Sequence, residues 1–371
     1  MAEPSTQDAA RIVIAGGGVA GFEAALALHD LAEERAELHL IDAEPELTLR
    51  PFSVEEPFSG RPAERYALGP AIEQLGGRFT LGRVEAVDPE ARTIAVADES
   101  APIGFDKLVV CLGARARPAF DPPALTVDAD RTGIPIDSLI ETAAAEGGEL
   151  ALLGPDAGSW PLPLYELALL ARERSEELGM RDVAIGIHSP ESTPLESFGP
   201  VPSAAVADLL ETRRIGFEGG GPVRATGSTA LALPELHGPA LAGLPDGGDG
   251  FIPVDDQGRV TGHADIYAAG DGTTYPIKQG GIASQQADVV AAAIAAELGA
   301  PVEPRRLRPV LRGMLLTGGT SLYMLRDLAD PADEGLITET CPWSPPEKIA
   351  GRYLVAWLRD LPVPDWDEGR G

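Results

Sequence analysis

The stretch RIVIAGGGVAGFEAALAL, residues 11–28, decides the fold. Its first part, residues 11–15, is a short β-branched apolar run, which is typical of a buried parallel strand. A glycine-rich segment at 16–21 follows, and the apolar spacing after it indicates a helix. A second strand-like run, ELHLI at 37–41, ends at Asp42. This order predicts a strand–turn–helix–strand unit at the start of an α/β protein.

Each glycine of the GxGxxG pattern has a physical role in such a unit. Gly16 allows the tight turn, Gly18 lets the backbone approach a pyrophosphate, and Gly21 lets helix and strand pack closely. The helix N-terminus presents free N–H groups to phosphates, and Asp42 can accept hydrogen bonds from a ribose. The alternative is a glycine-rich turn in another kind of α/β protein. The residues expected at this dinucleotide site are Gly16, Gly18, Val19, Ala20, Gly21, Asp42 and Ala43.

Two later segments favour FAD as the dinucleotide. Residues 79–110 contain short alternating strands, and the last of them runs through FDKLVVCLGA at 105–114. Much later, ADIYAAGDG at 264–272 predicts an apolar strand that ends in Gly270-Asp271, where a carboxylate can bind a ribityl hydroxyl. A long alanine-rich helix is expected at 282–298, and its first amides would favour negative charge on a reduced flavin ring.

These motifs resemble the pyridine nucleotide-disulfide oxidoreductase superfamily over roughly residues 10–360. In that family an early GxGxxG with its acid, a middle YDxLVxATG segment and a late GD segment together hold FAD. The resemblance implies two Rossmann-like dinucleotide-binding domains, with the NAD(P)-type domain inserted into a discontinuous FAD domain. The further cofactor-binding residues that it implies are Val84, Cys111, Leu112, Gly113, Gly270 and Asp271.

Within the superfamily, the chain looks most like the branch of type II NADH dehydrogenases and sulfide:quinone oxidoreductases. The features that carry this are Arg50-Pro51-Phe52, Lys278-Gln279-Gly280 with Gln285-Gln286, Ser189-Pro190-Glu191 with Phe198-Gly199, and the segment 346–354. The resemblance places Arg50, Pro51, Gln279 and Gly280 near the flavin.

Glu166 and Lys278 are the expected catalytic residues. Glu166 matches a helix glutamate close to the flavin ring in this branch, which implies proton handling or electrostatic tuning; the alternative is a glutamate on a helix surface. Lys278 can place positive charge near the flavin pyrimidine and favour its anionic reduced form. The alternative for Lys278 is a solvated loop lysine.

The sequence also departs from this branch. The sulfide enzymes use redox cysteines, but Ser159 or Trp160 stands at one cysteine position, and the other falls near Arg312-Gly313. Cys341 lies far downstream of that second position. The second nucleotide loop, 154–160, lacks the GxGxxG pattern, and the strand at 183–187 is not followed directly by an acid. The sequence therefore predicts an unusual NAD(P)H site or none.

The totals exclude several classes of protein. The net charge of −29 argues against a nucleic-acid partner and against docking on anionic lipid. Cys111 and Cys341 form no framework, which fits a reducing cytoplasmic compartment, and the histidines show no metal-ligand spacing. Residues 1–10 do not resemble a signal peptide, and no apolar run is long enough for a membrane span. The stripe Ile349, Tyr353, Trp357 and Leu361 is expected to pack internally rather than on a membrane.

The expected architecture is an FAD domain at 1–117 and 240–300, an NAD(P)-type domain at 118–239, and a C-terminal region at 301–371. The expected function is FAD-dependent electron transfer of the NAD(P)H dehydrogenase or quinone reductase kind. The donor is expected to be a small molecule and the acceptor a quinone or a protein. The alternatives are a sulfide:quinone oxidoreductase-like enzyme without the usual cysteines, and a non-catalytic flavin-binding scaffold or sensor. At most peripheral membrane contact is expected, and a homodimer is left open.

Overall fold

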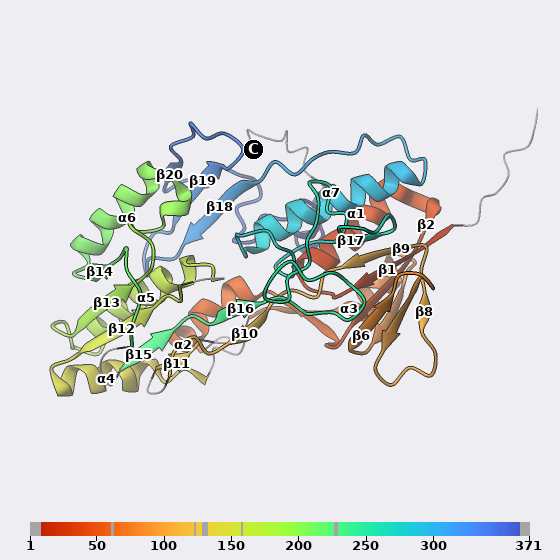
Figure 1. The fold of residues 1–371 in the computed structure, drawn as a ribbon. Helices are drawn as coiled ribbons and strands as arrows, with labels where there is room; N and C mark the ends of the chain where they lie inside the picture. The colour runs from red at the N-terminus through yellow and green to blue at the C-terminus, as the bar shows by residue number, and fades with distance from the viewer. Residues whose placement is uncertain are drawn as a thin grey trace, which may run out of the picture.

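The structure is a computed structural model. It describes residues 9–60, 63–121, 124–127, 133–156, 159–225 and 229–363, without the side chains of residues 50–52. Two α/β units lie side by side, and a C-terminal sheet and helix lie against them (Figure 1).

The first unit is built on a five-stranded parallel sheet in the order β17, β9, β1, β2, β5. Its strands are β1 (Ala10–Ala15), β2 (Ala36–Asp42), β5 (Arg78–Leu81), β9 (Lys107–Val110) and β17 (Ile266–Ala268). The helices of this unit are α1 (Val19–Ala32), α3 (Leu68–Gln74) and α7 (Gly280–Glu297). An antiparallel meander consists of β6 (Val84–Asp88), β7 (Thr93–Val96) and β8 (Ile103–Gly104).

Alternation along β1 explains how the first sheet is covered. Ile12 and Ile14 belong to a core shared with α1 and α7, whereas Val13 and Ala15 belong to a core shared with the meander. Both faces of this strand are therefore buried, as expected for a central parallel strand.

The second unit repeats this topology. Its parallel sheet has the order β11, β15, β12, β13, β14, so that its first long strand is flanked as β1 is in the first unit. The strands are β11 (Leu125–Thr126), β12 (Glu149–Leu153), β13 (Ala184–His188), β14 (Gly216–Glu218) and β15 (Ala230–Ala232). The helices are α4 (Ile136–Glu146), α5 (Leu162–Glu177) and α6 (Pro200–Thr212).

The second unit differs from the first in the segment that corresponds to the meander β6–β8. Residues 219–229 separate β14 from β15, and those that the structure describes, 219–225 and 229, form no strand. Where the first unit has the meander, between β5 and β9, the described residues between β14 and β15 of the second unit contain no strand.

Short elements connect the units and shape their edges. The antiparallel pair β10 (Arg115–Arg117) and β16 (Glu235–His237) carries the chain out of the first unit and back. The remaining short elements are β3 (Glu46–Thr48), β4 (Arg65–Ala67), α2 (Glu56–Ser59), and the 3-10 turns η1 (Glu33–Arg35), η2 (Arg50–Glu55) and η4 (Glu196–Phe198).

The C-terminal region packs on both units. Its sheet contains β18 (Val310–Leu315), β19 (Leu322–Asp327) and β20 (Leu336–Thr338), and Leu311 and Met324 enter the core of the second unit. The helix α8 (Arg352–Leu358) packs on α1, where the Trp357 ring meets that of Phe22 at 4.9 Å edge to face. Of the predicted apolar stripe, Ile349 and Tyr353 are buried in the core of the first unit, Trp357 is partly buried, and Leu361 is exposed.

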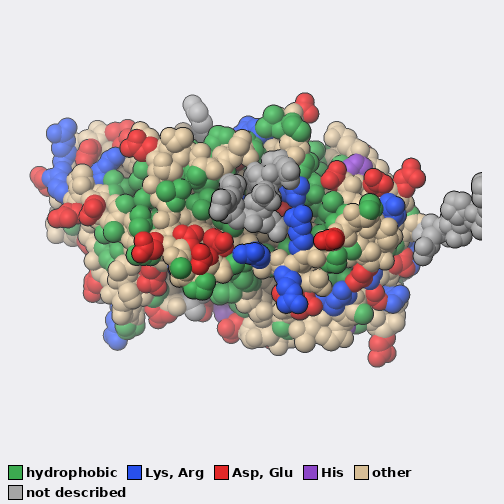
Figure 2. All heavy atoms as spheres, turned by 90° about the horizontal axis from the view of Figure 1, so that it is seen from above, with side chains coloured by type: hydrophobic (Ala, Val, Ile, Leu, Met, Phe, Trp, Pro, Cys, Tyr) green, Lys and Arg blue, Asp and Glu red, His purple; other side chains and the backbone are tan. Residues whose placement is uncertain are grey.

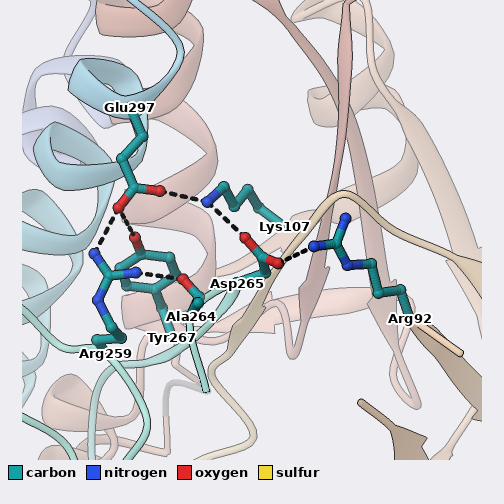
Figure 3. Close-up of polar contacts among 7 residues, drawn as sticks. All are labelled: Arg92, Lys107, Arg259, Ala264, Asp265, Tyr267 and Glu297. Carbon is teal, nitrogen blue, oxygen red and sulfur yellow. Dashed lines mark hydrogen bonds and ion pairs between the residues drawn. The ribbon is translucent and has the colours of Figure 1, made fainter. Parts of the chain in front are cut away.

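Charged side chains tie the amino-terminal edge of the first sheet to the end of α7 (Figure 3). Lys107 at the start of β9 pairs with Asp265 at 2.9 Å and with Glu297, the last residue of α7. The other members of this network are Arg92, which pairs with Asp265, and Arg259 and Tyr267, which both donate to Glu297. Lys107 thereby has a structural role at the edge opposite the glycine-rich turn.

The predicted α/β fold with two Rossmann-like units is confirmed. The helix expected at 282–298 is α7 at Gly280–Glu297, and the strand expected at 149–153 is β12. No helix in the described ranges is long and apolar enough to cross a membrane. On the face seen in Figure 2, acidic and basic side chains are interspersed among hydrophobic ones.

Candidate functional site

The glycine-rich turn of the first unit has the geometry of a phosphate cradle. A side chain at Gly16, whose φ is +104°, would overlap the carbonyl oxygen of Cys111, and one at Gly21 would overlap the carbonyl oxygen of Gly16. A Cβ at Gly18 would meet nothing within 4 Å, so this corner of the turn is open. The first helical bond of α1 runs from Phe22 N to Gly18 O at 2.9 Å. The amides of the first turn therefore have no partner within the helix and can bind phosphate oxygens.

Asp42 ends β2 beside this turn, as the sequence predicts. Its carboxylate is half-buried and accepts hydrogen bonds from Gly17 N and, at 2.8 Å, from Glu44 N. These bonds fix the carboxylate at the edge of the sheet, where it can also accept from ribose hydroxyls. Ala43 is exposed next to it.

The three predicted FAD segments meet at the carboxyl edge of the first sheet. A Cβ at Gly270 would lie 2.9 Å from the Ala20 Cβ, and one at Gly272 would lie 2.9 Å from the Gly113 carbonyl oxygen. The end of β17 is thus in contact both with the first turn of α1 and with the loop after β9. Gly270 is the residue just before Asp271, which is half-buried at the same edge.

Cys111 and Leu112 follow β9 between these segments. Cys111 is buried, its amide donates to Ala15 O at 2.7 Å, and burial raises the pKa of its thiol to about 12. A thiol of this kind is inert at neutral pH, so its contribution to the site is its small size and its backbone.

The start of α7 closes the cradle on another side. The Gln279 side chain accepts from Ile282 N at 2.8 Å and donates to Arg312 O at 2.9 Å. The side chain therefore caps α7 and holds β18. A cofactor would have to contact Gln279 through its backbone. A Cβ at Gly280 would lie 4.0 Å from Val19, which places this glycine over the start of α1.

Lys278 is buried, so it is not a solvated loop lysine. Its ammonium group donates to Thr273 O at 2.5 Å and lies 3.9 Å from the centroid of the Phe251 ring. Burial lowers the pKa of Lys278 to about 8, and the Asp271 carboxylate opposes that shift. A cation is thereby held next to the Gly270-Asp271 turn, in a fixed position.

Val84, Arg50 and Pro51 are the remaining predicted cofactor-binding residues. Val84 is the half-buried first residue of β6 and packs against the meander core. Arg50 and Pro51 begin η2, but their side chains lie outside the part of the chain that the structure describes.

Glu166 is buried rather than exposed on a helix surface. Its carboxylate forms an ion pair with Lys348 at 2.7 Å, and the side chains are 1% and 4% exposed, respectively. The same carboxylate accepts from Leu316 N at 3.1 Å. Glu166 therefore links α5 of the second unit to β18 and to the C-terminal segment. Lys348 was not among the residues predicted for the site, although it is one of only three lysines in the chain.

The described residues before α5 in the second unit, 154–156 and 159–161, do not form a phosphate cradle like that of the first unit. Helix α5 begins at Leu162 after Pro161, and Pro163 occupies its second position. A proline has no N–H group, and Leu164 N donates to Pro161 O at 2.9 Å, so few amides remain at this helix end. The Trp160 ring packs 5.6 Å from that of Phe198 beside this turn.

An acid does lie near the end of β13, although not directly after it. Glu191 accepts from the Tyr165 hydroxyl at 2.7 Å and from Ser189 Oγ at 3.1 Å, and burial raises its pKa to about 7. Its Oε1 atom is buried and has no hydrogen-bond partner among the described residues. Glu191 therefore points into the unit rather than toward a ribose.

Cys341 lies nearer to the second expected cysteine position than its place in the sequence suggests. It is half-buried within electrostatic range of the Arg312 guanidinium on β18. Burial raises the pKa of the Cys341 thiol, and Arg312 opposes this shift. Among the described residues, no group of three or more His, Cys, Asp or Glu side chains could hold a metal ion.

Comparisons with known proteins agree with this geometry. Residues 10–143 match the family described as pyridine nucleotide-disulphide oxidoreductase. No curated protein matches the sequence significantly. Among solved structures, the sulfide:quinone oxidoreductase from the hyperthermophilic bacterium Aquifex aeolicus has a TM-score of 0.78 at 18% identity, covering 89% of this chain and 87% of that one.

Two further structures share the fold. NDH2 from Plasmodium falciparum in complex with NADH has a TM-score of 0.65 at 13% identity, covering 88% of this chain and 91% of that one. A ferredoxin reductase of the CYP199A2 system from Rhodopseudomonas palustris has a TM-score of 0.61 at 20% identity, with coverage of 86% and 82%. The predicted resemblance to pyridine nucleotide-disulfide oxidoreductases is thus matched by the family over residues 10–143, and the whole chain shares its fold with a sulfide:quinone oxidoreductase and an NDH2.

Proposed function

We propose that this protein is an FAD-dependent oxidoreductase that passes electrons from a small-molecule donor to a quinone or protein acceptor. One observation carries the proposal: three distant segments meet at the carboxyl edge of the first sheet around Gly18, where an added Cβ would meet nothing within 4 Å. Bound FAD would supply the redox chemistry, because its ring can accept a hydride or electrons and return them singly or in pairs.

The residues around this edge fit the parts of FAD. The first-turn amides of α1 would bind the pyrophosphate next to Gly18, and Asp42 would accept from the adenosine ribose. Asp271 would bind a ribityl hydroxyl. The amino-terminal end of α7 at Gly280 and the Lys278 ammonium would favour negative charge on the flavin pyrimidine.

Glu166 has a different role in this proposal from that of a free general base. Its carboxylate is occupied by Lys348 and by Leu316 N, so a proton reaches it only if that ion pair is disturbed. The proposed role of Glu166 is electrostatic: with Lys348 it forms a neutral, fixed pair between the second unit and the C-terminal segment.

We propose that the electron donor is not a dinucleotide bound to the second unit. Pro163 removes an amide at the start of α5, and the exposed Asp156 would repel a phosphate in the same loop. A sulfur compound is the second candidate donor. It is favoured by the likeness to the Aquifex aeolicus sulfide:quinone oxidoreductase and by Cys341 within range of Arg312.

An anaerobic donor screen tests the function. FAD-loaded protein is mixed with NADH, NADPH or sulfide, loss of the visible band of oxidised flavin is followed, and a soluble quinone is then added. Reduction by a donor and reoxidation by the quinone support the proposal. If dithionite bleaches the flavin but no donor does, the non-catalytic scaffold is favoured and the proposal fails.

A charge-removing variant and its control test whether a nicotinamide donor binds at the loop before α5. If NADH binds on the loop before α5, Asp156→Asn should lower its apparent Kd about fivefold, since two like charges at about 4 Å in water cost about 1 kcal/mol. Asp30→Asn on α1 is the control for net charge. An unchanged Kd in both variants supports docking elsewhere.

A further inference from the structure

Glu23 is a fully buried acid one turn into α1, close after the glycine cradle. It is 0% exposed, and its two carboxylate oxygens accept from Tyr353 N and Leu354 N, both at 2.7 Å. These amides belong to the first turn of α8, whose own N-cap residue, Gly351, makes no side-chain cap bond. Glu23 thus caps a helix that lies about 330 residues away in the sequence.

A second carboxyl group lies against the first. Asp288 on α7 hydrogen-bonds to the Glu23 side chain. Two carboxyl groups can form such a bond only if one of them carries a proton, so the pair holds one shared proton. Because both Glu23 oxygens already accept amides, Asp288 is the group that donates. Loss of this proton would leave two adjacent negative charges in a buried place, which is strongly unfavourable.

The segment held by this cap forms a wall of the FAD cradle. A Cβ at Gly280 would lie 3.9 Å from the Ile349 side chain, just before α8. A Cβ at Gly351 would lie 2.8 Å from Glu23 Oε2 and 2.9 Å from Ser284 Oγ, so the chain passes very close to both helices. If α8 moves away from α1, Ile349 must leave the cradle with it.

We propose that Glu23 and Asp288 form a proton-sharing latch that holds helix α8, and with it residues 348–351, against the FAD cradle, so that loss of the shared proton releases FAD. Glu23 is a positioning residue, since it acts on the cofactor through α8. The inference rests on FAD binding as proposed above and adds to it a control of cofactor retention by pH.

Charged and titratable groups on both helices next to α7 lie near this latch. Besides Glu23 and Asp288, the charged groups that act on Tyr353 of α8 are Arg352 on the same helix and Asp30 on α1. Burial is the main reason that the pKa of Glu23 is raised to about 7, and the amides of α8 oppose that shift. The shared proton is therefore lost nearer to neutrality than the proton of an ordinary carboxyl group.

Release of FAD from the holoprotein between about pH 6 and about pH 9 tests the latch. If one proton must be lost, the release rate should rise by up to about tenfold per pH unit through the titration. In Asp288→Asn the amide donates to Glu23 permanently, so release should stay slow and independent of pH. In Glu23→Gln one α8 amide loses its acceptor, so release should be fast at every pH. Asp30→Asn, a control of equal charge change, should follow the wild type.

Hydrogen exchange of residues 352–358 gives a second measurement that needs no flavin. Corrected for intrinsic rates, protection of α8 should fall with rising pH in the wild type and stay constant in Asp288→Asn. The latch is overturned if Asp288→Asn shows the pH dependence of the wild type in either measurement. A protein that takes up no FAD would overturn the proposed function, and the exchange experiment would still decide on the latch.

Discussion

Replacing Lys348 with methionine leaves the Glu166 carboxylate buried without its cation. The ion pair is 2.7 Å long, Lys348 and Glu166 are 4% and 1% exposed, and the carboxylate also accepts from Leu316 N at 3.1 Å. Removing one member of a buried pair typically costs about 3–5 kcal/mol, because the remaining charge is desolvated without compensation. We expect Lys348→Met to lower the free energy of unfolding by this amount.

A double-mutant cycle separates the pair from the loss of packing. Glu166→Gln keeps an acceptor for Leu316 N, and Lys348→Met/Glu166→Gln leaves neither charge of the pair, so the double variant should regain about 2–3 kcal/mol relative to the sum of the single changes. Urea unfolding, followed by far-UV circular dichroism, measures each corner. Lys107→Met is the matched control, because Lys107 is 14% exposed and its partners are partly solvated.

Lys107→Met is expected to lower the free energy of unfolding by only about 1 kcal/mol, as for an ion pair near the surface. The reasoning is wrong if Lys348→Met costs no more than Lys107→Met, or if the two changes at Lys348 and Glu166 are additive.

Three more outcomes follow from the site. Gly18→Ala should keep wild-type stability but bind FAD at least about tenfold more weakly, since the added Cβ would enter only the space proposed for the cofactor. Gly21→Ala should fail to fold properly, and thermal melts with flavin titration distinguish the two variants. Burial lowers the pKa of Lys278 from 10.5 to about 8, so the native protein loses stability as the pH falls through that window; Lys278→Met should remove this dependence in urea unfolding at both ends of the window. A disulfide reagent should react with Cys341 in the native protein and with Cys111 only after denaturation, which a thiol count before and after urea measures.

Local patterns made most of the fold predictable from the sequence. The strand, the glycine pattern and the helix at 10–32 follow one another over a few residues, and Gly21 is required by the Gly16 carbonyl five residues before it, although Gly16 itself faces the backbone of the distant Cys111. The same holds for the strand at 149–153 and for α7, whose apolar runs are long and uniform. The carboxyl edge could then be placed, since parallel strands in such units bring their ends together.

Contacts between distant segments were not predictable in this way. The pair of Glu166 and Lys348 joins residues 182 apart, and Glu23 is joined to α8 across about 330 residues. No local spacing connects either set. Gln279 shows the converse: its motif predicts contact with the flavin, but the side chain is used to cap α7 and to hold β18. Which of two polar partners a side chain takes is decided by packing of the C-terminal region.

That region has a mechanical consequence. Two α/β units joined by a pair of crossing strands would ordinarily be free to rotate against each other. Here β18 and β19 supply Leu311 and Met324 to one core, and the following segment supplies Ile349 and Leu354 to the other. Residues 310–358 thus join the two halves, because they contribute side chains to both cores. A hinge motion between the two units would expose core side chains, so while α8 is in place we expect an opening that admits a donor to come from loops and side chains.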